Sequence, residues 1–82
     1  MMDLSIEAFK EHLERQGRKR TADTYYYVLM SFERWLVLEK DMIIDDVTPS
    51  IVEEYMSMQS PRTANILYYA LRSYYKLSLI HI

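Results

Sequence analysis

Three consecutive cations, Arg18, Lys19 and Arg20, stand where the hydrophobic pattern predicts the start of a helix. Positive charge there opposes the positive end of the helix macrodipole, so the placement is unfavourable for folding alone. A phosphate at that helix end would contact the cations and the free backbone N–H groups, with the hydroxyls of Thr21 and Thr24 as further donors. The alternative is a solvated basic turn without a ligand. The run therefore indicates a candidate phosphate contact.

A second expected helix start offers similar chemistry. Arg62, Thr63 and Asn65 follow it, and the side-chain amide of Asn65 suits a phosphate or a base edge. Arg72 and Lys76 come one turn apart further along the same helix, on a side that carries no acid. The alternative is an ordinary capped helix with a surface arginine. These residues extend the candidate site only if the two helix starts are neighbours in the fold, which is what we expect.

The sequence shows no constellation typical of an enzyme. His12 and His81 are not at metal-ligand spacing, and the absence of cysteine excludes a disulfide or a thiolate metal site. The acidic stretch 41–46 lacks the glycine and the terminal glutamate of a calcium loop. Neither a Gly-rich phosphate loop nor a nucleophile elbow occurs. We expect no catalytic activity, no metal, no cofactor and no small-molecule substrate for this chain.

Eight tyrosines raise the question of base stacking. Tyr25 and Tyr74 fall on apolar stripes, where an aromatic ring with its hydroxyl at the edge is ordinary packing. Tyr26, Tyr27 and Tyr69 are less constrained and are the ones that could touch a nucleic-acid backbone. Core or rim packing is the expected role of most of them.

Composition predicts a single all-α domain covering residues 1–82. Half of the residues are apolar, glycine occurs once and proline twice, which is typical of helices joined by few turns. The net charge of −2 is unevenly distributed along the chain. Two basic zones, 15–24 and 55–82, each carry +3, whereas two acidic zones, 1–14 and 41–54, carry −3 and −5. Such segregation gives a small domain a positive face if the basic zones fold together.

The first helix is expected to begin after Ser5, whose hydroxyl suits an N-cap. Leu4 and Phe9 have the spacing of a hydrophobic staple around that start. Gly17 suits the left-handed conformation that ends a helix, so the helix should end at about Gln16.

Three further helices and their connector follow from the same signals. We expect the second helix from Lys19 or Ala22 to Leu38, the third from Pro49 to Ser57 and the fourth from Pro61 to about Leu77. Thr48 and Ser60 are the expected N-caps of the last two, each followed by proline at the first helical position. Residues 39–41 should break the helical pattern, and Ile43, Ile44 and Val47 should lie in an acidic connector without regular structure.

The apolar stripes of these helices predict a compact monomeric bundle of four, or at most five, helices. Leu29, Phe32 and Leu71 lie in the middle of their stripes and should be buried. The inner faces are expected to be Ile6, Phe9 and Leu13 on the first helix, Tyr25, Leu29, Phe32 and Leu36 on the second, and Ala64, Leu67, Leu71, Tyr74 and Tyr75 on the fourth. No apolar stretch approaches the roughly 20 residues needed to span a bilayer, and the start of the chain lacks the positive charge of a signal peptide. We therefore expect a soluble cytoplasmic protein without membrane contact.

The order of the apolar and polar positions resembles a known family. The relevant runs are Phe9-x-x-x-Leu13, Thr21-x-x-x-Tyr25-x-x-x-Leu29-x-x-Phe32-x-x-Trp35-Leu36, Ile44-x-x-Val47-Thr48-x-x-x-Val52-x-x-Tyr55, Ser60-x-x-Thr63 and Ala70-Leu71-Arg72-x-Tyr74-Tyr75. Together they resemble the N-terminal core-binding (SAM-like) domain of tyrosine recombinases of the phage-integrase family. The resemblance spans nearly the whole chain.

This resemblance implies a DNA-binding domain that covers one face of duplex DNA during recombination or integration, without cutting it. The catalytic domain would follow residue 82 in the same parent chain, and other recombinase protomers would share the DNA. In the family the second and fourth helices lie against the major groove and its phosphates, which would make neighbours of the two basic zones. A helical protein-interaction or oligomerisation module without DNA binding is the alternative. The expected DNA-binding residues are Arg18, Lys19, Arg20, Thr21, Thr24, Arg62, Thr63, Asn65, Arg72 and Lys76.

Overall fold

The computed structural model describes residues 5–80, with side chains described to Leu77, and within that range it contains helices and no strands. The four α-helices are α1 (Ile6–Arg15), α2 (Lys19–Trp35), α3 (Pro49–Ser57) and α4 (Pro61–Ile80). A π-helical turn, η1 (Leu36–Lys40), extends α2, and a single 3-10 turn, η2 (Ile44–Asp46), precedes α3. The all-α prediction is confirmed.

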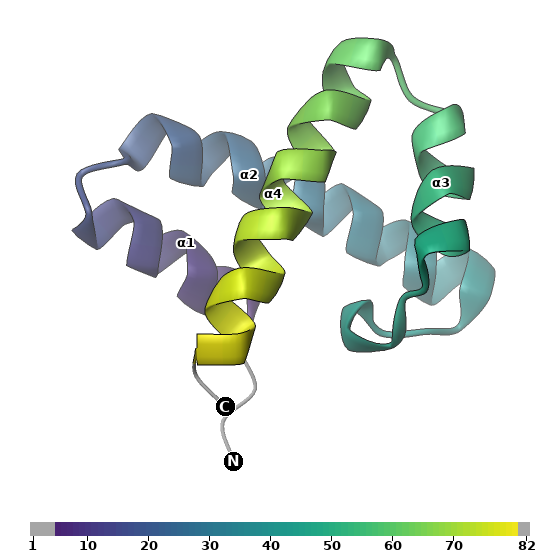
Figure 1. Cartoon of the computed structure of the whole chain (residues 1–82), viewed down its shortest axis with the longest axis horizontal. Coiled ribbons are helices and arrows are strands. Elements are labelled where there is room, and N and C mark those ends of the chain that lie inside the picture. The colour runs from purple at the N-terminus through teal and green to yellow at the C-terminus, as the bar shows by residue number, and fades with distance from the viewer. Residues whose placement is uncertain (1–4, 81–82) are drawn as a thin grey trace.

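The helices form two hairpins in a flat molecule of 32 × 31 × 18 Å. The first hairpin is α1 with α2, and the second is α3 with α4 (Figure 1). The long helix α4 crosses α2 and brings its last turns beside α1. The two basic zones are thus carried by elements that contact each other.

The core contains side chains from all four α-helices, and the expected burial of Leu29, Phe32 and Leu71 is confirmed. Aromatic rings fill much of it: Phe9 meets Tyr74 edge to face at 5.6 Å between centroids, and Phe32 meets Tyr55 at 4.9 Å. The buried hydrophobic residues are Ile6, Phe9, Leu13, Ala22, Val28, Leu29, Phe32, Leu36, Ile44, Tyr55, Leu67, Ala70, Leu71, Tyr74 and Leu77. Three residues expected on the inner faces are only partly buried, namely Tyr25, Ala64 and Tyr75.

Local signals placed most helix ends correctly. The hydroxyl of Ser5 accepts the N–H of Ala8 at 3.0 Å, and Gly17 adopts φ +76° after α1 ends. Helix α3 has the predicted bounds, whereas α4 continues three residues beyond the predicted end. The staple expected from Leu4 lies outside the described residues.

The region after α2 differs from the prediction. Helical backbone continues to Lys40 as η1, and the turn closes because Asp41 takes a left-handed conformation at φ 49°. Aspartate tolerates that conformation better than most residues. The connector also contains η2, where Ile44 is buried and its carbonyl accepts the Tyr75 hydroxyl at 2.6 Å. Burial first, and the negative charge of Asp45 second, raise the pKa of this tyrosine to about 12.

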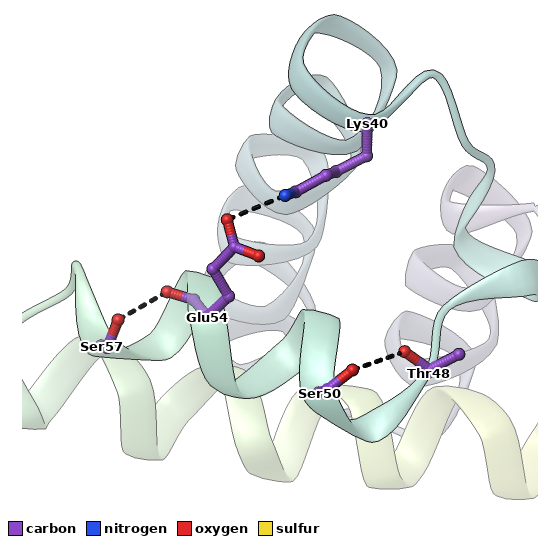
Figure 2. A network of polar contacts seen from close by, with 5 residues as sticks. All are labelled: Lys40, Thr48, Ser50, Glu54 and Ser57. Atoms are coloured by element: carbon purple, nitrogen blue, oxygen red, sulfur yellow. Dashed lines mark hydrogen bonds and ion pairs between the residues drawn. The ribbon is translucent and has the colours of Figure 1, made fainter.

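The predicted caps of α3 and α4 behave differently. The Thr48 carbonyl accepts the first backbone bonds of α3, but its hydroxyl lies 3.1 Å from the Ser50 hydroxyl and caps no N–H (Figure 2). The Ser60 hydroxyl accepts the N–H of Thr63 at 3.2 Å, which satisfies a donor at the start of α4.

This difference predicts unequal effects of two matched substitutions. Ser60→Ala is expected to lower the free energy of unfolding by about 1 kcal/mol, because it removes a capping bond. Thr48→Ala should cost clearly less, since no backbone N–H loses its partner. Urea unfolding of both variants, followed by circular dichroism, gives the comparison. Equal losses would contradict the assignment of Ser60 as a cap.

Candidate nucleic-acid interface

A groove between α1 and α4 joins the two basic zones. Arg18, from the first zone, and Lys76, from the second, both line it. The groove has a volume of about 260 Å³ and is lined by Phe9, His12, Leu13, Gln16, Arg18, Ser73, Lys76 and Leu77. None of these residues is a carboxylate, so an anion in the groove meets no acidic lining side chain.

The turn between α1 and α2 positions Arg18 at this groove. Gly17 reverses the chain, and the backbone N–H of Arg18 then donates to the carbonyl of Leu13 at 3.0 Å. This bond holds the start of α2 against the end of α1. Lys76 reaches the groove from α4, one turn after Arg72. Arg72 is exposed but does not line the groove.

The N-terminus of α2 is suited to an anion. Arg18 occupies the N-cap position, no side chain caps the helix, and its first turn contains no acid. Lys19 and Arg20 are exposed, whereas Thr21 is partly buried. Uncapped N–H groups and the helix dipole both favour negative charge at this end.

A second groove, between α2 and the start of α4, brings two more predicted residues together. Thr24 and Thr63 line it, along with Asp23, Tyr27, Val28 and Ile66, and its volume is about 410 Å³. The carboxylate of Asp23 makes this groove less suitable for phosphate than the α1–α4 groove. Thr63 also accepts a hydrogen bond from the Ser60 hydroxyl at 3.0 Å.

The starts of α2 and α4 lie apart in the fold. The first lies beside the α1–α2 turn, whereas the second lies next to the end of α3, at the opposite end of α4 from its last turns (Figure 1). Arg62 and Asn65 are exposed there and line no groove with Arg18. The predicted residues therefore divide into three places: the α1–α4 groove with the start of α2, the α2–α4 groove, and the start of α4.

Within the described range, two lysines outside the predicted site form ion pairs, whereas the predicted DNA-binding cations do not. Lys10 lies 3.7 Å from Asp23, and Lys40 lies 2.9 Å from Glu54 (Figure 2). Among the described residues, none of the predicted DNA-binding cations forms an ion pair: Arg18, Lys19, Arg20, Arg62, Arg72 and Lys76. Their charge is therefore not neutralised within the described part of the chain.

The acidic residues of the connector and α3 lie away from the α1–α4 groove. The elements that carry them, η2 and α3, occupy the far side of the molecule from the α1–α2 turn (Figure 1). The other acidic zone includes Glu11 and Glu14 on α1, which are exposed and do not line the groove.

Comparisons with known proteins do not indicate a function for this chain. No family model, curated protein or solved structure matches the chain. Within residues 5–80 no three His, Cys, Asp or Glu side chains gather in a way that could hold a metal ion. Among the described helices, none combines the length and the apolar character that crossing a bilayer requires.

Three polar groove residues were missed by sequence reasoning: His12, Gln16 and Ser73. His12 on α1 and Gln16 at the C-cap of that helix come one turn apart beside the core stripe of Phe9 and Leu13, a spacing that places them at the edge of the packed face. That signal was present in the sequence, but it required knowing which helix packs beside α1.

Proposed function

We propose that this chain is the DNA-gripping domain of a tyrosine-recombinase-type protein, and that it binds the phosphates of duplex DNA without cutting them. The observation that carries the proposal is the α1–α4 groove, where cations from both basic zones meet without a carboxylate. Affinity for DNA comes mainly from such contacts between cations and phosphates. The family resemblance of the sequence supports the same function.

The surroundings of the groove suit a phosphate diester. Arg18 and Lys76 supply the charge, and His12, Gln16 and Ser73 add side chains able to donate hydrogen bonds. The uncapped start of α2 adds backbone donors next to Arg18. Phosphate contacts of this kind fix the position of the protein on DNA and carry no sequence information.

Other predicted residues have separate roles in this proposal. Lys19, Arg20 and Arg72 are exposed near the groove elements and extend the basic surface. Asn65 is exposed at the far end of α4, where its amide is free to read a base edge. Catalysis belongs to a catalytic domain in the same parent chain, other protomers share the DNA, and the complex works in the cytoplasm.

Fluorescence anisotropy with a labelled duplex tests the proposal directly. We expect dissociation constants of about 1–100 µM at moderate salt, as is typical of phosphate-dominated binding, and a steep loss of affinity as salt rises. Denaturing gels should show no covalent protein–DNA adduct. Absence of binding at low salt would overturn the proposal, and an adduct would contradict the location of catalysis elsewhere.

A protein-interaction module without DNA binding is the alternative, and exposed apolar residues favour it. Val37 and Leu38 are 54% and 73% exposed at the end of the α2–η1 helix. Sedimentation with and without duplex DNA separates the two functions, because only the DNA-binding domain should sediment faster when the duplex is added.

A further inference from the structure

A partly exposed stripe runs along the last turns of α2 and through η1. Met30, Glu33, Arg34, Val37 and Leu38 line one shallow groove on this surface, and no other element contributes to it. The apolar residues lie at the two ends of the stripe, Met30 at one and Val37 with Leu38 at the other. The charged residues Glu33 and Arg34 lie between them. The stripe lies on the last turns of α2 and on η1, whereas the α1–α4 groove is lined by Arg18 at the N-cap of α2.

Arg34, Val37 and Leu38 are exposed, whereas Met30 and Glu33 are partly buried and Met30 packs against the core. Val37 and Leu38 belong to the π-helical turn, a rare conformation that occurs frequently at functional sites. Neither Glu33 nor Arg34 forms an ion pair within the described part of the chain. The stripe therefore has both apolar surface and charge available for a partner.

The order of residues makes the stripe complementary to itself. If two copies pack antiparallel about a two-fold axis between positions 33 and 34, Met30 of each copy faces Val37 and Leu38 of the other. The same axis places Glu33 of each copy opposite Arg34 of the other. Two-fold interfaces require this property, because the same patch must supply both halves of every contact.

We propose that the Met30–Leu38 stripe is a homodimer interface, in which α2 and η1 of two copies pack antiparallel with two Glu33–Arg34 ion pairs across the axis. The proposal differs from the monomer that the apolar stripes predict, and the oligomeric state in solution decides between the two. It forms without DNA and does not depend on the DNA-binding function. A nine-residue stripe is smaller than the roughly 800 Å² per partner of a standard interface, so association is expected to be weak, with a dissociation constant of about 10 µM to 1 mM.

Charge reversal tests the proposed register. In sedimentation velocity without DNA, the wild-type chain should shift from monomer to dimer across that concentration range. Glu33→Arg and Arg34→Glu should each weaken self-association at least about tenfold (1.4 kcal/mol), because the axis then brings together four like charges. An equimolar mixture of the two variants should dimerise again, since one now supplies two arginines and the other two glutamates.

A matched variant controls for overall charge. Glu53→Arg makes the same change as Glu33→Arg at an exposed position on α3, and it should leave self-association unchanged. Circular dichroism checks that each variant keeps its helices. A wild-type chain that stays monomeric to 1 mM, an equal loss with Glu53→Arg, or a mixture that does not recover would each overturn the proposal.

Discussion

Phe32→Ala is expected to lower the free energy of unfolding by about 3–5 kcal/mol. A domain of this size has a total stability of about 5–15 kcal/mol, so the variant should lose much of it. Its thermal midpoint should fall by roughly 12–40 °C at the 4–8 °C per kcal/mol typical of small domains. Thermal and urea unfolding, followed by far-UV circular dichroism, measure both quantities.

The size of this effect follows from the position of the ring. Phe32 is fully buried between the two hairpins, where it packs on Tyr55 of α3 and on Trp35 of its own helix. Its removal leaves a cavity lined by residues of separate helices, which cannot all move inward to fill it. The substitution therefore loses both the burial of the ring and the contacts around it.

Tyr27→Ala is the matched control for Phe32→Ala. Tyr27 is an aromatic residue on the same helix, but it is 74% exposed. Its truncation should change the free energy of unfolding by about 0.5 kcal/mol or less, as surface substitutions usually do. If Phe32→Ala unfolds like the parent chain, or like Tyr27→Ala, the assignment of Phe32 to the centre of the core is wrong.

Helix starts and stops were predictable because their causes lie within a few residues. Ser5 and Ser60 each accept an N–H three residues later, and Gly17 supplies the left-handed turn. The apolar stripes were predictable for the same reason, since one helix face is defined by its own spacing. These local signals account for the four helices and for the burial of Leu29, Phe32 and Leu71.

The end of α2 was not predictable because its geometry depends on distant residues. Lys40 lies over the Trp35 ring, 5.5 Å from its centroid, and pairs with Glu54 of α3 (Figure 2). The sequence placed Lys40 in a break after the helix, whereas these contacts hold it in a π-helical turn. A cation–π contact and an ion pair between two elements cannot be predicted from the local spacing of apolar and polar residues.

The charged residues of the candidate site were predictable from the sequence, but their arrangement in space was not. Counting charges along the chain located both basic zones, yet which parts of them meet depends on how α4 crosses α2. The crossing places Lys76 rather than Arg62 near Arg18, and it brings His12 of α1 into the same groove. His12 belongs to a third helix, α1, and it joins the site only because α1 packs beside α4. The charge pattern along the chain therefore could not have identified it.

The substitution pair that follows from this arrangement is Arg18→Ala with Lys76→Ala. The double variant is expected to bind duplex DNA on the order of tenfold more weakly, a loss of about 1.4 kcal/mol. The slope of log K against log salt should decrease in magnitude by about 1.8, since each lost phosphate contact contributes about 0.9. The loss should be similar for different DNA sequences, because phosphate contacts do not distinguish bases. Anisotropy titrations of two unrelated duplexes over a range of salt concentrations measure all three quantities.

A control must change the net charge equally without touching the groove or an ion pair. Lys10 and Lys40 are unsuitable because both are paired with acids. Ile43→Glu with Ser50→Glu also lowers the net charge by two, at exposed positions of the connector and of the start of α3 that line neither the α1–α4 groove nor the α2–α4 groove. This variant should retain most of the affinity, because its added charges lie far from the bound phosphates and are screened beyond about 10 Å. Equal losses from the two double variants would mean that binding follows overall charge, and the α1–α4 groove would then no longer be the site of phosphate contact.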